Sequence, residues 1–551
     1  MKESWKGKIQ CLAVLCLLIA FYALTRPLNH AESYDGINYA LFAENFPLGT
    51  APDSRNILFH VVNRILVVAS ESLGLNVGTL ELLSSVSIVT GALSLILFAR
   101  LMRKRFQVSA FSANSGAAFL GLSYGYWRYA GGVEVYVPSI FLILCCLTLI
   151  FKYLNDENLQ QGTLIAAGVL SGLAVLFYQP NVIVLFAVAF ILFCSTRHFF
   201  SFVSYSAIGA LVVVSGIVMA CAAVNGDFPS PDEVVSFLKS RNSEFGGRPS
   251  IGVALVKLVL AFGHDLFSAH WTRTIDPVRN FLDPLIPGCV YNFNVVTYAG
   301  RGIQSLTAIA AILFVPLLLV LLRMHWVAKS RWKLTKPSRG VLFLFAWLGL
   351  LGLVVGTIDP GSFEAWIPVL VPFAALLTVL VIEPCYQLGK QKTVLSFLFL
   401  MLCYNFFGGA LIWRNTDGDY FAQKTTWIRQ ELTEGDVVLL NEFDYRLVDY
   451  LNYYGDAQVA NLYGENKVTI SRSHPDIHSI TLDVFLKKVD AGQFRLFVMG
   501  DVLTPDPAIK KCRYGEHKFE AAMELAKRIK PNAVMVDSGR FGEMFQIKPA
   551  K

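Results

Sequence analysis

The chain contains a series of long apolar segments that carry almost no charge, and this pattern limits the folds open to it. Eleven segments approach the roughly 20 apolar residues that a helix needs to cross a bilayer. They lie at about 9–25, 77–99, 109–126, 135–154, 162–177, 181–196, 202–224, 303–322, 340–357, 366–382 and 393–412. Charged residues make up 16% of the chain, whereas soluble proteins usually carry about 25%. The pattern predicts a polytopic, all-α membrane bundle of about eleven transmembrane helices.

The basic residues predict how this bundle is oriented. Lysine and arginine gather in short loops that eleven spans would place on one face, and the positive-inside rule assigns that face to the cytoplasm. The clusters are Lys2–Lys8, Arg100–Arg105, Lys152, Arg197, Arg323–Arg339 and Lys390–Lys392. Because these loops account for the net charge of +7, the charge indicates no nucleic-acid partner. The extracytoplasmic face then receives the loops at about 26–76 and 225–302 and everything after residue 412.

The last part of the chain has the composition of a soluble domain. Apolar strands are predicted at 437–440, 494–499 and 533–536, and they alternate with helical segments at 445–454, 481–490 and 515–529. Such alternation favours a small α/β domain. The domain has no Gly-x-Gly-x-x-Gly motif and no P-loop, so we expect no nucleotide site in it. The predicted domains are therefore a bundle over 1–412 and an extracytoplasmic α/β domain over 413–551.

The first outer loop contains two helical patterns. Ser33 is suited to cap a helix from Tyr34 to about Phe46, and a second helix begins near Asp53. The second is apolar nearly all round, which favours a place at the lipid interface over a place in water. The loop therefore holds Asp35 close to the membrane face, about ten residues beyond the first span.

Asp35 and Glu134 are the candidate catalytic acids. Glu134 lies in a tight turn between two spans, within the aromatic stretch 124–138. An ionisable group at such a depth is costly in lipid, so Glu134 is expected to face the bundle interior or a wet cavity. Two alternatives stay open: Asp35 caps a helix or faces solvent, and Glu134 forms a structural salt bridge with Arg128.

Arg55, Arg128 and Arg273 are candidate binding residues on the outer face. Arginine there runs against the positive-inside bias. The planar guanidinium suits two-pronged binding of phosphate or carboxylate. The alternative for each is an ordinary surface charge.

Gln179 and Glu364 also lie at predicted outer turns. Gln179 interrupts an apolar hairpin, where it either lines a cavity or only makes the turn. Glu364 precedes Trp366 at the start of a span, and the pair either contributes to a site or anchors the helix at the interface.

His264 and His270 fall in the long outer loop at 225–302. Their separation of six residues differs from that of a helical metal pair, so a zinc site is not expected. The chain also lacks a clear Asp-x-Asp. No cofactor is predicted, and a divalent metal has no clear motif to support it.

The pattern resembles the GT-C superfamily of integral-membrane glycosyltransferases, which includes protein O-mannosyltransferases and bacterial lipid A aminoarabinose transferases. Asp35 matches the family's acidic position soon after the first helix, and Glu134 matches a second acidic position between helices three and four. The stretch from Tyr126-Trp127-Arg128 to Glu134-Val135-Tyr136 is similar to the family's aromatic and Glu-Val-Tyr segment. Interfacial helices and a C-terminal extracytoplasmic domain are further points of resemblance.

The resemblance implies an inverting glycosyl transfer. The donor would be a sugar on a polyprenyl phosphate in the bilayer, and the acceptor a hydroxyl or amine of a glycan, lipid or protein on the outer side. Asp35 would be the general base, although the assignment between Asp35 and Glu134 stays open. An arginine would offset the charge of the departing phosphate. The implied substrate-binding residues are Arg55, Arg128, Tyr136, Gln179, His264, His270, Arg273 and Glu364.

The implied location is a bacterial inner or plasma membrane, with the C-terminal domain outside the cytoplasm. Two other classes remain. A transporter or flippase of lipid-linked glycans would use the same acids and arginines for binding, but such proteins tend to carry charge near mid-span and to show repeated halves. A non-catalytic scaffold would leave the outer acids and arginines unexplained.

Overall fold

The structure, a computed structural model, describes residues 5–31, 35–45, 56–154, 161–194, 199–239, 251–273, 275–282, 301–332, 339–358, 361–433, 435–440, 445–454, 458–463, 467–471, 478–505 and 515–549. The chain forms two compact units. The bundle unit comprises Met1–Leu28, Pro47–Asp276 and Arg301–Arg414. The C-terminal unit comprises Asn29–Phe46, Pro277–Gly300 and Asn415–Lys551. A segment of the predicted first outer loop thus groups with the end of the chain.

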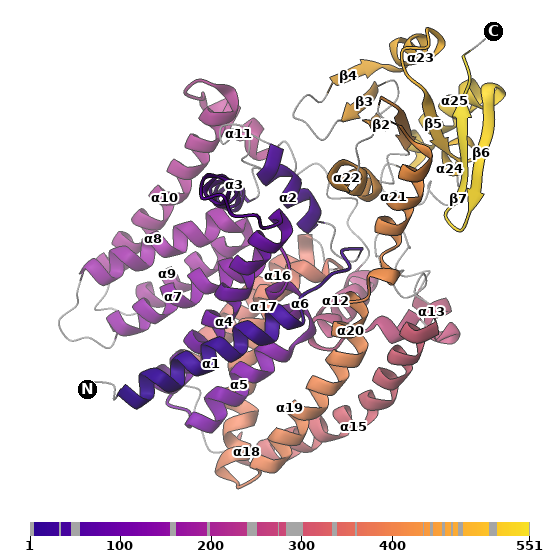
Figure 1. The fold of residues 1–551 in the computed structure, drawn as a ribbon. Coiled ribbons are helices and arrows are strands. Elements are labelled where there is room, and N and C mark those ends of the chain that lie inside the picture. The colour runs from indigo at the N-terminus through magenta and orange to yellow at the C-terminus, as the bar shows by residue number, and fades with distance from the viewer. Residues whose placement is uncertain are drawn as a thin grey trace. The chain divides into compact units, whose positions relative to one another are not determined.

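The secondary structure of the bundle unit is helical, as far as its described residues show (Figure 1). Its helices are α1 (Trp5–Leu24), α3 (Ile57–Ser72), α4 (Thr79–Arg105), α5 (Ala110–Leu122), α6 (Tyr124–Ala130), α7 (Tyr136–Leu154), α8 (Gln161–Phe177), α9 (Val182–Cys194), α10 (Phe199–Asn225), α11 (Pro231–Lys239), α12 (Ile251–Leu266), α15 (Arg301–Trp332), α16 (Arg339–Ile358), α17 (Phe363–Leu377), α18 (Glu383–Gln387), α19 (Gln391–Asn405) and α20 (Leu411–Trp413). Helices α7, α8 and α10 pack side by side, as do α15 and α19. π-Helical turns join α17 to α18 and α19 to α20.

Seven stretches of helix are long and apolar enough to cross a membrane, counted over the described residues. They are Thr79–Arg105, Tyr136–Leu154, Phe200–Asn225, Ser305–Lys329, Gly340–Thr357, Phe363–Gln387 and Gln391–Trp413. Three shorter apolar helices are Ile9–Leu24, Gln161–Phe177 and Gln179–Phe190. The prediction of a multi-pass helical bundle is confirmed, whereas the count of eleven spans stays a prediction.

The outward surface of several of these helices is strongly apolar. Leu211 on α10 is 66% exposed, and Ile312 on α15 is 73% exposed. In a soluble protein such surfaces would be unfavourable next to water, whereas lipid accommodates them. These side chains therefore mark the face of the bundle unit that meets the hydrocarbon.

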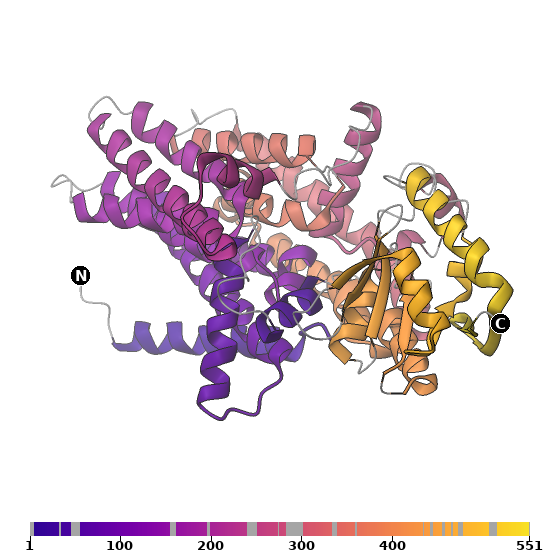
Figure 2. The ribbon, with the colours of Figure 1, turned by 90° about the horizontal axis from the view of Figure 1, so that it is seen from above.

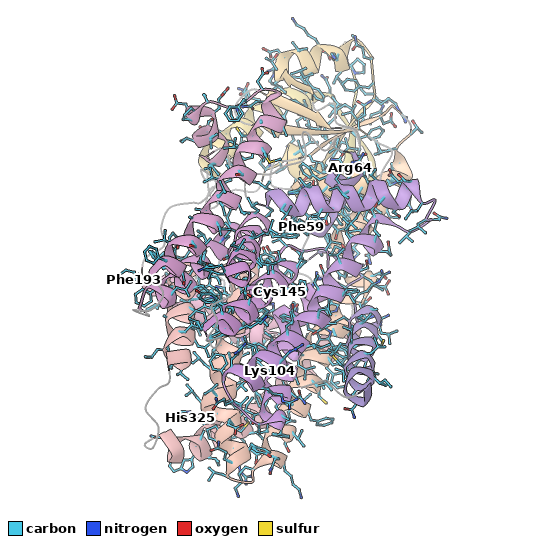
Figure 3. The ribbon with its side chains drawn as sticks, turned by 90° about the vertical axis from the view of Figure 1, so that its left-hand side faces the viewer. Phe59, Arg64, Lys104, Cys145, Phe193 and His325 are labelled. Atoms are coloured by element: carbon cyan, nitrogen blue, oxygen red, sulfur yellow. The ribbon has the colours of Figure 1, made fainter. Side chains whose placement is uncertain are left out.

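The basic residues that end α4 lie at one end of the bundle unit. Arg103, Lys104 and Arg105 form the last turn of α4, where positive charge complements the helix dipole. Figure 3 shows Lys104 and His325 toward the end of this unit that is remote from Phe59 and Arg64 of α3. The grouping of all the basic loops on one face, and the side of the membrane that they occupy, stay predictions.

The predicted span at 109–126 is one place where the structure differs from the sequence pattern. The helix breaks at Ser123, whose ψ of 135° is extended, and continues as α6 to Ala130. The Ser123 hydroxyl donates to the Phe119 carbonyl at 2.8 Å, and the Ser123 amide donates to the same carbonyl at 3.0 Å. The break redirects the chain and brings the aromatic stretch into the interior.

The C-terminal unit is built on a seven-stranded mixed sheet in the order β4-β3-β2-β1-β5-β7-β6 (Figure 2). The strands are β1 (Val437–Leu440), β2 (Gln458–Tyr463), β3 (Lys467–Ser471), β4 (His478–Thr481), β5 (Leu496–Met499), β6 (Ala533–Gly539) and β7 (Gly542–Ile547). The helices in and beside this unit are α2 (Asp35–Asn45), α13 (Asp276–Leu282), α21 (Tyr420–Glu431), α22 (Tyr445–Tyr454), α23 (Leu482–Asp490), α24 (Gly500–Leu503) and α25 (Gly515–Ile529).

The centre of this sheet is parallel. Strand β1 pairs with β2 through Val438 and Val459, and with β5 through Val438 and Phe497. Every residue of β1 and β5 is buried, as expected for parallel strands covered on both faces. The prediction of a small α/β domain is confirmed, and each of its six predicted elements coincides with an observed one.

Residues 29–45 join this sheet domain through polar contacts. Asn29 Nδ2 donates to the Asn415 carbonyl at 3.2 Å, and the His30 amide donates to Asp419 Oδ2 at 2.9 Å. Helix α2 packs against α22. The predicted helix from Tyr34 to about Phe46 is thus observed as α2, whereas its proposed cap, Ser33, lies outside the described residues.

Candidate functional site

Helix α6 brings the aromatic stretch into the bundle interior. All seven of its residues, Tyr-Gly-Tyr-Trp-Arg-Tyr-Ala, are buried. Tyr126 donates to the Gly91 carbonyl at 2.9 Å, and Trp127 Nε1 donates to Thr25 Oγ1 at 2.8 Å. Gly125 is needed for a close approach, because a Cβ there would lie 2.6 Å from Asp265 Oδ1. A short helix surrounded on all sides is therefore fixed by specific bonds to α1 and α4.

Arg128, on helix α6, is buried in the interior of the bundle. Its side chain is 2% exposed, and its Cζ lies 5.6 Å from the ring centre of Trp413 and 5.8 Å from that of Tyr129. Contacts of this kind stabilise a cation over an aromatic face, most of all where water is excluded. The aromatic rings therefore hold a permanent positive charge inside an apolar bundle.

The turn after α6 places Glu134 beside Arg128. Glu134 is 2% exposed. A Cβ on Gly132 would lie 3.6 Å from Arg128 Nη1 and 3.7 Å from Glu134 Cγ, so both side chains border the same backbone position. Gly131 allows the turn to press against the chain after α1, since a Cβ there would lie 2.9 Å from Pro27 Cδ and 3.1 Å from the Arg26 Cα. Glu134 faces the interior, as predicted.

Glu364 accepts two phenolic hydrogen bonds in the same unit. Tyr136 donates to its Oε2 at 2.9 Å, and Tyr129 donates to its Oε1 at 3.3 Å. Glu364 lies in the first turn of α17, where the helix dipole favours a negative charge. The Tyr136 ring also packs at 5.0 Å against Tyr178, which directly precedes Gln179. Two predicted residues, Tyr136 and Glu364, are thus in direct contact, and a third, Gln179, follows Tyr178 in the chain.

The two predicted histidines meet around Tyr124. Tyr124 and His270 share a hydrogen bond of 2.8 Å between the hydroxyl and Nε2. The rings of His264 and His270 are 5.1 Å apart and perpendicular, and each is 1% exposed. His264 Nδ1 accepts from the Ala269 amide at 2.9 Å, which assigns the ring proton of His264 to Nε2.

Trp413 connects the histidine group to the arginine. Its ring lies 5.0 Å from Tyr124 and 6.1 Å from Trp127, in addition to its contact with Arg128. Its Nε1 donates to the Thr25 carbonyl at 3.0 Å. Helix α6, the ends of α1, α12 and α20 and the starts of α7 and α17 therefore contribute to one polar, aromatic cluster in the bundle unit.

The remaining predicted residues are placed less fully. Asp35 is the first residue of α2 and belongs to the C-terminal unit. Arg55 lies outside the described residues, and Arg273 ends a short 3₁₀ turn from His270 while its side chain is likewise not described.

Sequence reasoning missed Trp413, Tyr124, Tyr129 and Tyr178 as site residues. Three of them had a usable signal. Tyr124 and Tyr129 belong to the stretch that was examined for Glu134, and Tyr178 adjoins Gln179. Trp413 resembled an ordinary end-of-helix tryptophan, and only its long-range packing distinguishes it.

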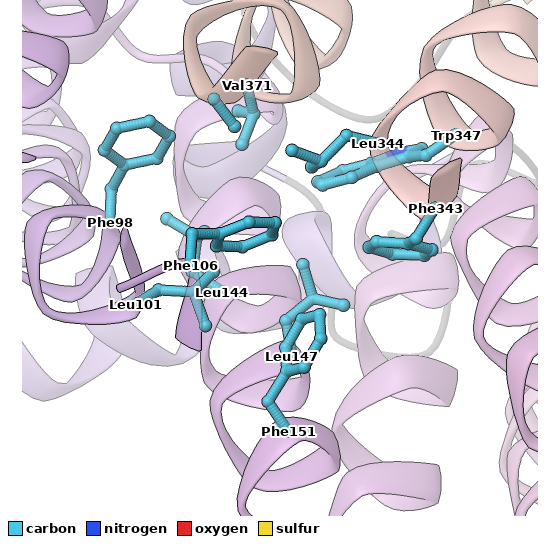
Figure 4. A pocket seen from close by; sticks show the side chains of 11 residues that line it. Phe98, Leu101, Phe106, Leu144, Leu147, Phe151, Phe343, Leu344, Trp347 and Val371 are labelled. Carbon is cyan, nitrogen blue, oxygen red and sulfur yellow. The ribbon is translucent and has the colours of Figure 1, made fainter. Parts of the chain in front are cut away.

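An apolar cavity lies elsewhere in the bundle unit, among α4, α7, α16 and α17 (Figure 4). Its lining residues are Phe98, Leu101, Phe106, Leu144, Leu147, Phe151, Phe343, Leu344, Trp347, Val371 and Ala375. On α7 the lining begins at Leu144, eight residues beyond Tyr136, which is about 12 Å along a helix. With no acid, base or nucleophile in its wall, this cavity carries no chemistry for group transfer.

Metal binding finds no ready site in the part of the chain that the structure describes. No three histidine, cysteine, aspartate or glutamate side chains come together there in a way that could hold an ion.

No family model and no curated protein matches the sequence. Solved structures do match. ArnT from Cupriavidus metallidurans in the apo state aligns over 99% of this chain and 100% of its own, with 15% identity and a TM-score of 0.51. The same protein bound to undecaprenyl phosphate aligns over 100% of both chains, with 15% identity and a TM-score of 0.49. The Archaeoglobus fulgidus oligosaccharyltransferase tethered to an acceptor peptide is covered over 75% of its length and covers 100% of this chain, with 14% identity and a TM-score of 0.46.

Of these three matches, the one to apo ArnT exceeds a TM-score of 0.5, and the conclusion about the fold rests on it. Together with the seven membrane-crossing stretches of helix among the described residues, it establishes an architecture. The chain is a multi-pass membrane protein with the fold of the GT-C membrane glycosyltransferases.

Proposed function

We propose that this protein is a membrane glycosyltransferase that moves a sugar from a polyprenyl-phosphate donor to an extracytoplasmic acceptor with inversion. One observation carries the proposal: Arg128 and Glu134, each 2% exposed, lie together in an apolar membrane bundle. Ionisable groups at such a position are costly and are typical of functional sites. The GT-C fold supports the same conclusion, because the fold occurs in enzymes of this class.

The reaction requires one displacement. A carboxylate takes the proton of the acceptor hydroxyl or amine, and the freed electron pair attacks the anomeric carbon of the donor sugar. The bond from that carbon to the phosphate oxygen breaks, and polyprenyl phosphate leaves with the electron pair. Arg128 is always charged, and its guanidinium would stabilise the negative charge that develops on the departing phosphate.

The base is either Asp35 or Glu134. Glu134 is supported by its place beside Arg128, and Asp35 by its position at the start of the first outer-loop helix. Both candidates are therefore tested in parallel below.

Glu364 is suited to bind sugar hydroxyls. A carboxylate accepts at about four lone-pair positions, and the phenols of Tyr129 and Tyr136 occupy two of them. The tyrosines would hold the carboxylate in one orientation while it accepts from substrate. His264, His270, Gln179, Arg55 and Arg273 complete the proposed substrate-binding set.

The fold and the lipid environment support the proposed donor class. ArnT from Cupriavidus metallidurans has been crystallised with undecaprenyl phosphate. A polyprenyl donor would enter the site from the bilayer, and the phosphate would meet Arg128. The location in a bacterial inner or plasma membrane and the extracytoplasmic C-terminal domain remain part of this proposal.

The test compares Asp35→Asn and Glu134→Gln in cells that express the full chain. Lipid-linked sugars and envelope glycans are extracted and measured by mass spectrometry, with and without the protein. Loss of the general base should lower product by about 10²- to 10⁴-fold and cause the donor to accumulate. Asp232→Asn, an exposed acid in the first turn of α11, is the matched control and should behave as wild type.

Two results would contradict the proposal. Wild-type product in both Asp35→Asn and Glu134→Gln would remove the carboxylate base. Transfer of the lipid-linked sugar across the bilayer without any new glycosidic bond would instead favour a flippase.

A further inference from the structure

Helix α2, which carries Asp35, is separated in sequence from the domain that holds it. The helix groups with the C-terminal unit and packs against α22 (Figure 1). Six of its eleven residues are buried: Gly36, Ile37, Tyr39, Ala40, Leu41 and Ala43. A helix of this length is marginal alone in water, so its order depends on what it packs against.

A hydrogen bond joins the two helices one turn from Asp35. Asn38 Nδ2 donates to Asp449 Oδ2 at 3.1 Å, and the two residues are 411 positions apart in the chain. Asn38 lies three residues after Asp35, and residues with this spacing are neighbours on a helix surface. The bond therefore fixes the face of α2 that also presents Asp35.

The buried position of Asp449 allows its carboxyl to lie near a second acid, Asp35. Burial raises the pKa of Asp449 to about 7, the hydrogen bond from Asn38 lowers it, and the charge of Asp35 raises it. Near neutral pH the Asp449 carboxyl is therefore protonated in a large fraction of molecules. A protonated Asp449 can lie near Asp35 without the full repulsion of two charges.

A second polar contact anchors the chain just before α2. Asp419 Oδ2 accepts from the His30 amide and from the Tyr450 hydroxyl, both at 2.9 Å. Asp419 Oδ1 accepts from the Ala422 amide at 3.0 Å, where it caps α21. One buried carboxylate thus ties the entry to α2 to both α21 and α22.

We infer that Asn38 and Asp449 are positioning residues, through which the C-terminal domain holds α2 and sets the orientation of Asp35. This inference rests on the proposed function, in which Asp35 is a candidate base. The sheet domain would then influence the reaction through α2, and neither Asn38 nor Asp449 would contact the reacting atoms.

The first test measures whether α2 depends on this bond. Hydrogen exchange followed by mass spectrometry is performed on the full-length protein in detergent, and the amides of residues 35–45 are compared among variants. Asn38→Ala and Asp449→Ala each remove one hydrogen bond and should speed exchange of α2 about fivefold. Asp449→Asn keeps an acceptor for Asn38 and should restore the wild-type exchange rate.

Asp436→Ala is the matched control in the same domain. Asp436 accepts from Arg495 Nε at 2.7 Å and from the Thr433 amide at 2.6 Å, so its loss weakens the domain through other partners. It should lower the unfolding temperature and leave exchange in α2 unchanged. Equal acceleration in Asp436→Ala, or no acceleration in Asn38→Ala and Asp449→Ala, would overturn the inference.

The second test is the cellular product assay described above, on the same variants. Product should fall about fivefold or more in Asn38→Ala and Asp449→Ala and recover in Asp449→Asn. If α2 exchanges faster while product stays at the wild-type level, the positioning role is wrong. Failure of the proposed function is recognised separately, because it appears as normal product in both Asp35→Asn and Glu134→Gln.

Discussion

The two candidate bases lie in regions that are built in opposite ways. Glu134 is placed by its own neighbours: a short buried helix, two glycines and an arginine within seven residues bring it into the bundle interior. Asp35 is placed by a distant partner, because α2 packs on α22 of the C-terminal unit and Asn38 bonds to Asp449, 411 residues away. An acid can thus be fixed by the backbone and side chains next to it in the sequence or by a distant domain. The two arrangements respond differently to mutation.

Arg128→Ala tests the locally built region and should have a larger effect than the Asp449 and Tyr136 variants. Removing an oriented charge from the transition state typically costs about 10²- to 10³-fold in rate, and we expect product to fall by that factor. The product made by Arg128→Lys should lie between that of wild type and that of Arg128→Ala, because lysine keeps the charge and loses the planar contact with Trp413 and Tyr129. Product per molecule of protein, measured by mass spectrometry of lipid-linked and envelope sugars, decides the result.

The control for this variant is Arg103→Ala in the last turn of α4. It removes an arginine from the basic end of the bundle and should leave product unchanged. Purified Arg128→Ala should also bind undecaprenyl phosphate more weakly than Arg103→Ala does. Normal transfer by Arg128→Ala would show that the turn is structural and would leave Asp35 as the better-supported acid.

The second effect is on stability and tests the region built by the distant domain. The pKa of Asp449 is raised by burial from 3.8 to about 7, so the folded chain keeps a proton that the unfolded chain releases. Stability should therefore fall as the pH rises from about 4 to about 7 and level off above that. Asp449→Asn removes this dependence and should be more stable than wild type above pH 7, by a few kcal/mol at most, at about 1.4 kcal/mol per pKa unit.

Thermal unfolding of the full-length protein at pH 5 and pH 8 measures this difference. The gap in unfolding temperature between Asp449→Asn and wild type should widen at pH 8. An equal gap at both values would mean that burial does not raise the pKa of Asp449.

The smallest effect concerns the orientation of Glu364. Tyr136→Phe removes a 2.9 Å hydrogen bond and keeps the ring that packs on Tyr178, so we expect product to fall about five- to tenfold. Tyr129→Phe, which loses a 3.3 Å bond, should cost less. The cellular product assay is again the measurement.

Tyr153→Phe is the matched control on the same helix. Tyr153 is also buried and also bonds through its hydroxyl, to Ser201, near the other end of α7. A loss of product in Tyr153→Phe as large as that in Tyr136→Phe would indicate a general weakening of the bundle.

The part of the candidate site around α6 could be predicted from the sequence because its residues lie close together in the chain. Arg128, Glu134 and Tyr136 fall within nine positions, and an apolar neighbourhood makes each charge conspicuous. Contacts between residues that are far apart in the sequence could not be predicted. Nothing in the order of residues links Trp413 to Arg128, and that contact depends on how the helices pack.

The C-terminal domain shows the same limit. Strands β1 and β5 are runs of buried apolar residues and were predicted, whereas β4 (His-Ser-Ile-Thr) is short and polar and was not. The docking of α2 on α22 could not be predicted either, because single hydrogen bonds such as Asn38 to Asp449 leave no periodic trace in a sequence.

The π-helical turn Phe406–Ala410 has a consequence for how this chain is compared with others. A π turn holds about one residue more than an α turn, and each helical residue advances the direction of its side chain by about 100°. Relative to Tyr404, the side chain of Trp413 therefore points about 100° away from the direction that it would have in an uninterrupted α-helix. A distant relative without the extra residue would present its equivalent tryptophan one position earlier. At 15% identity, correspondence across this turn has to follow helix phase and not sequence order.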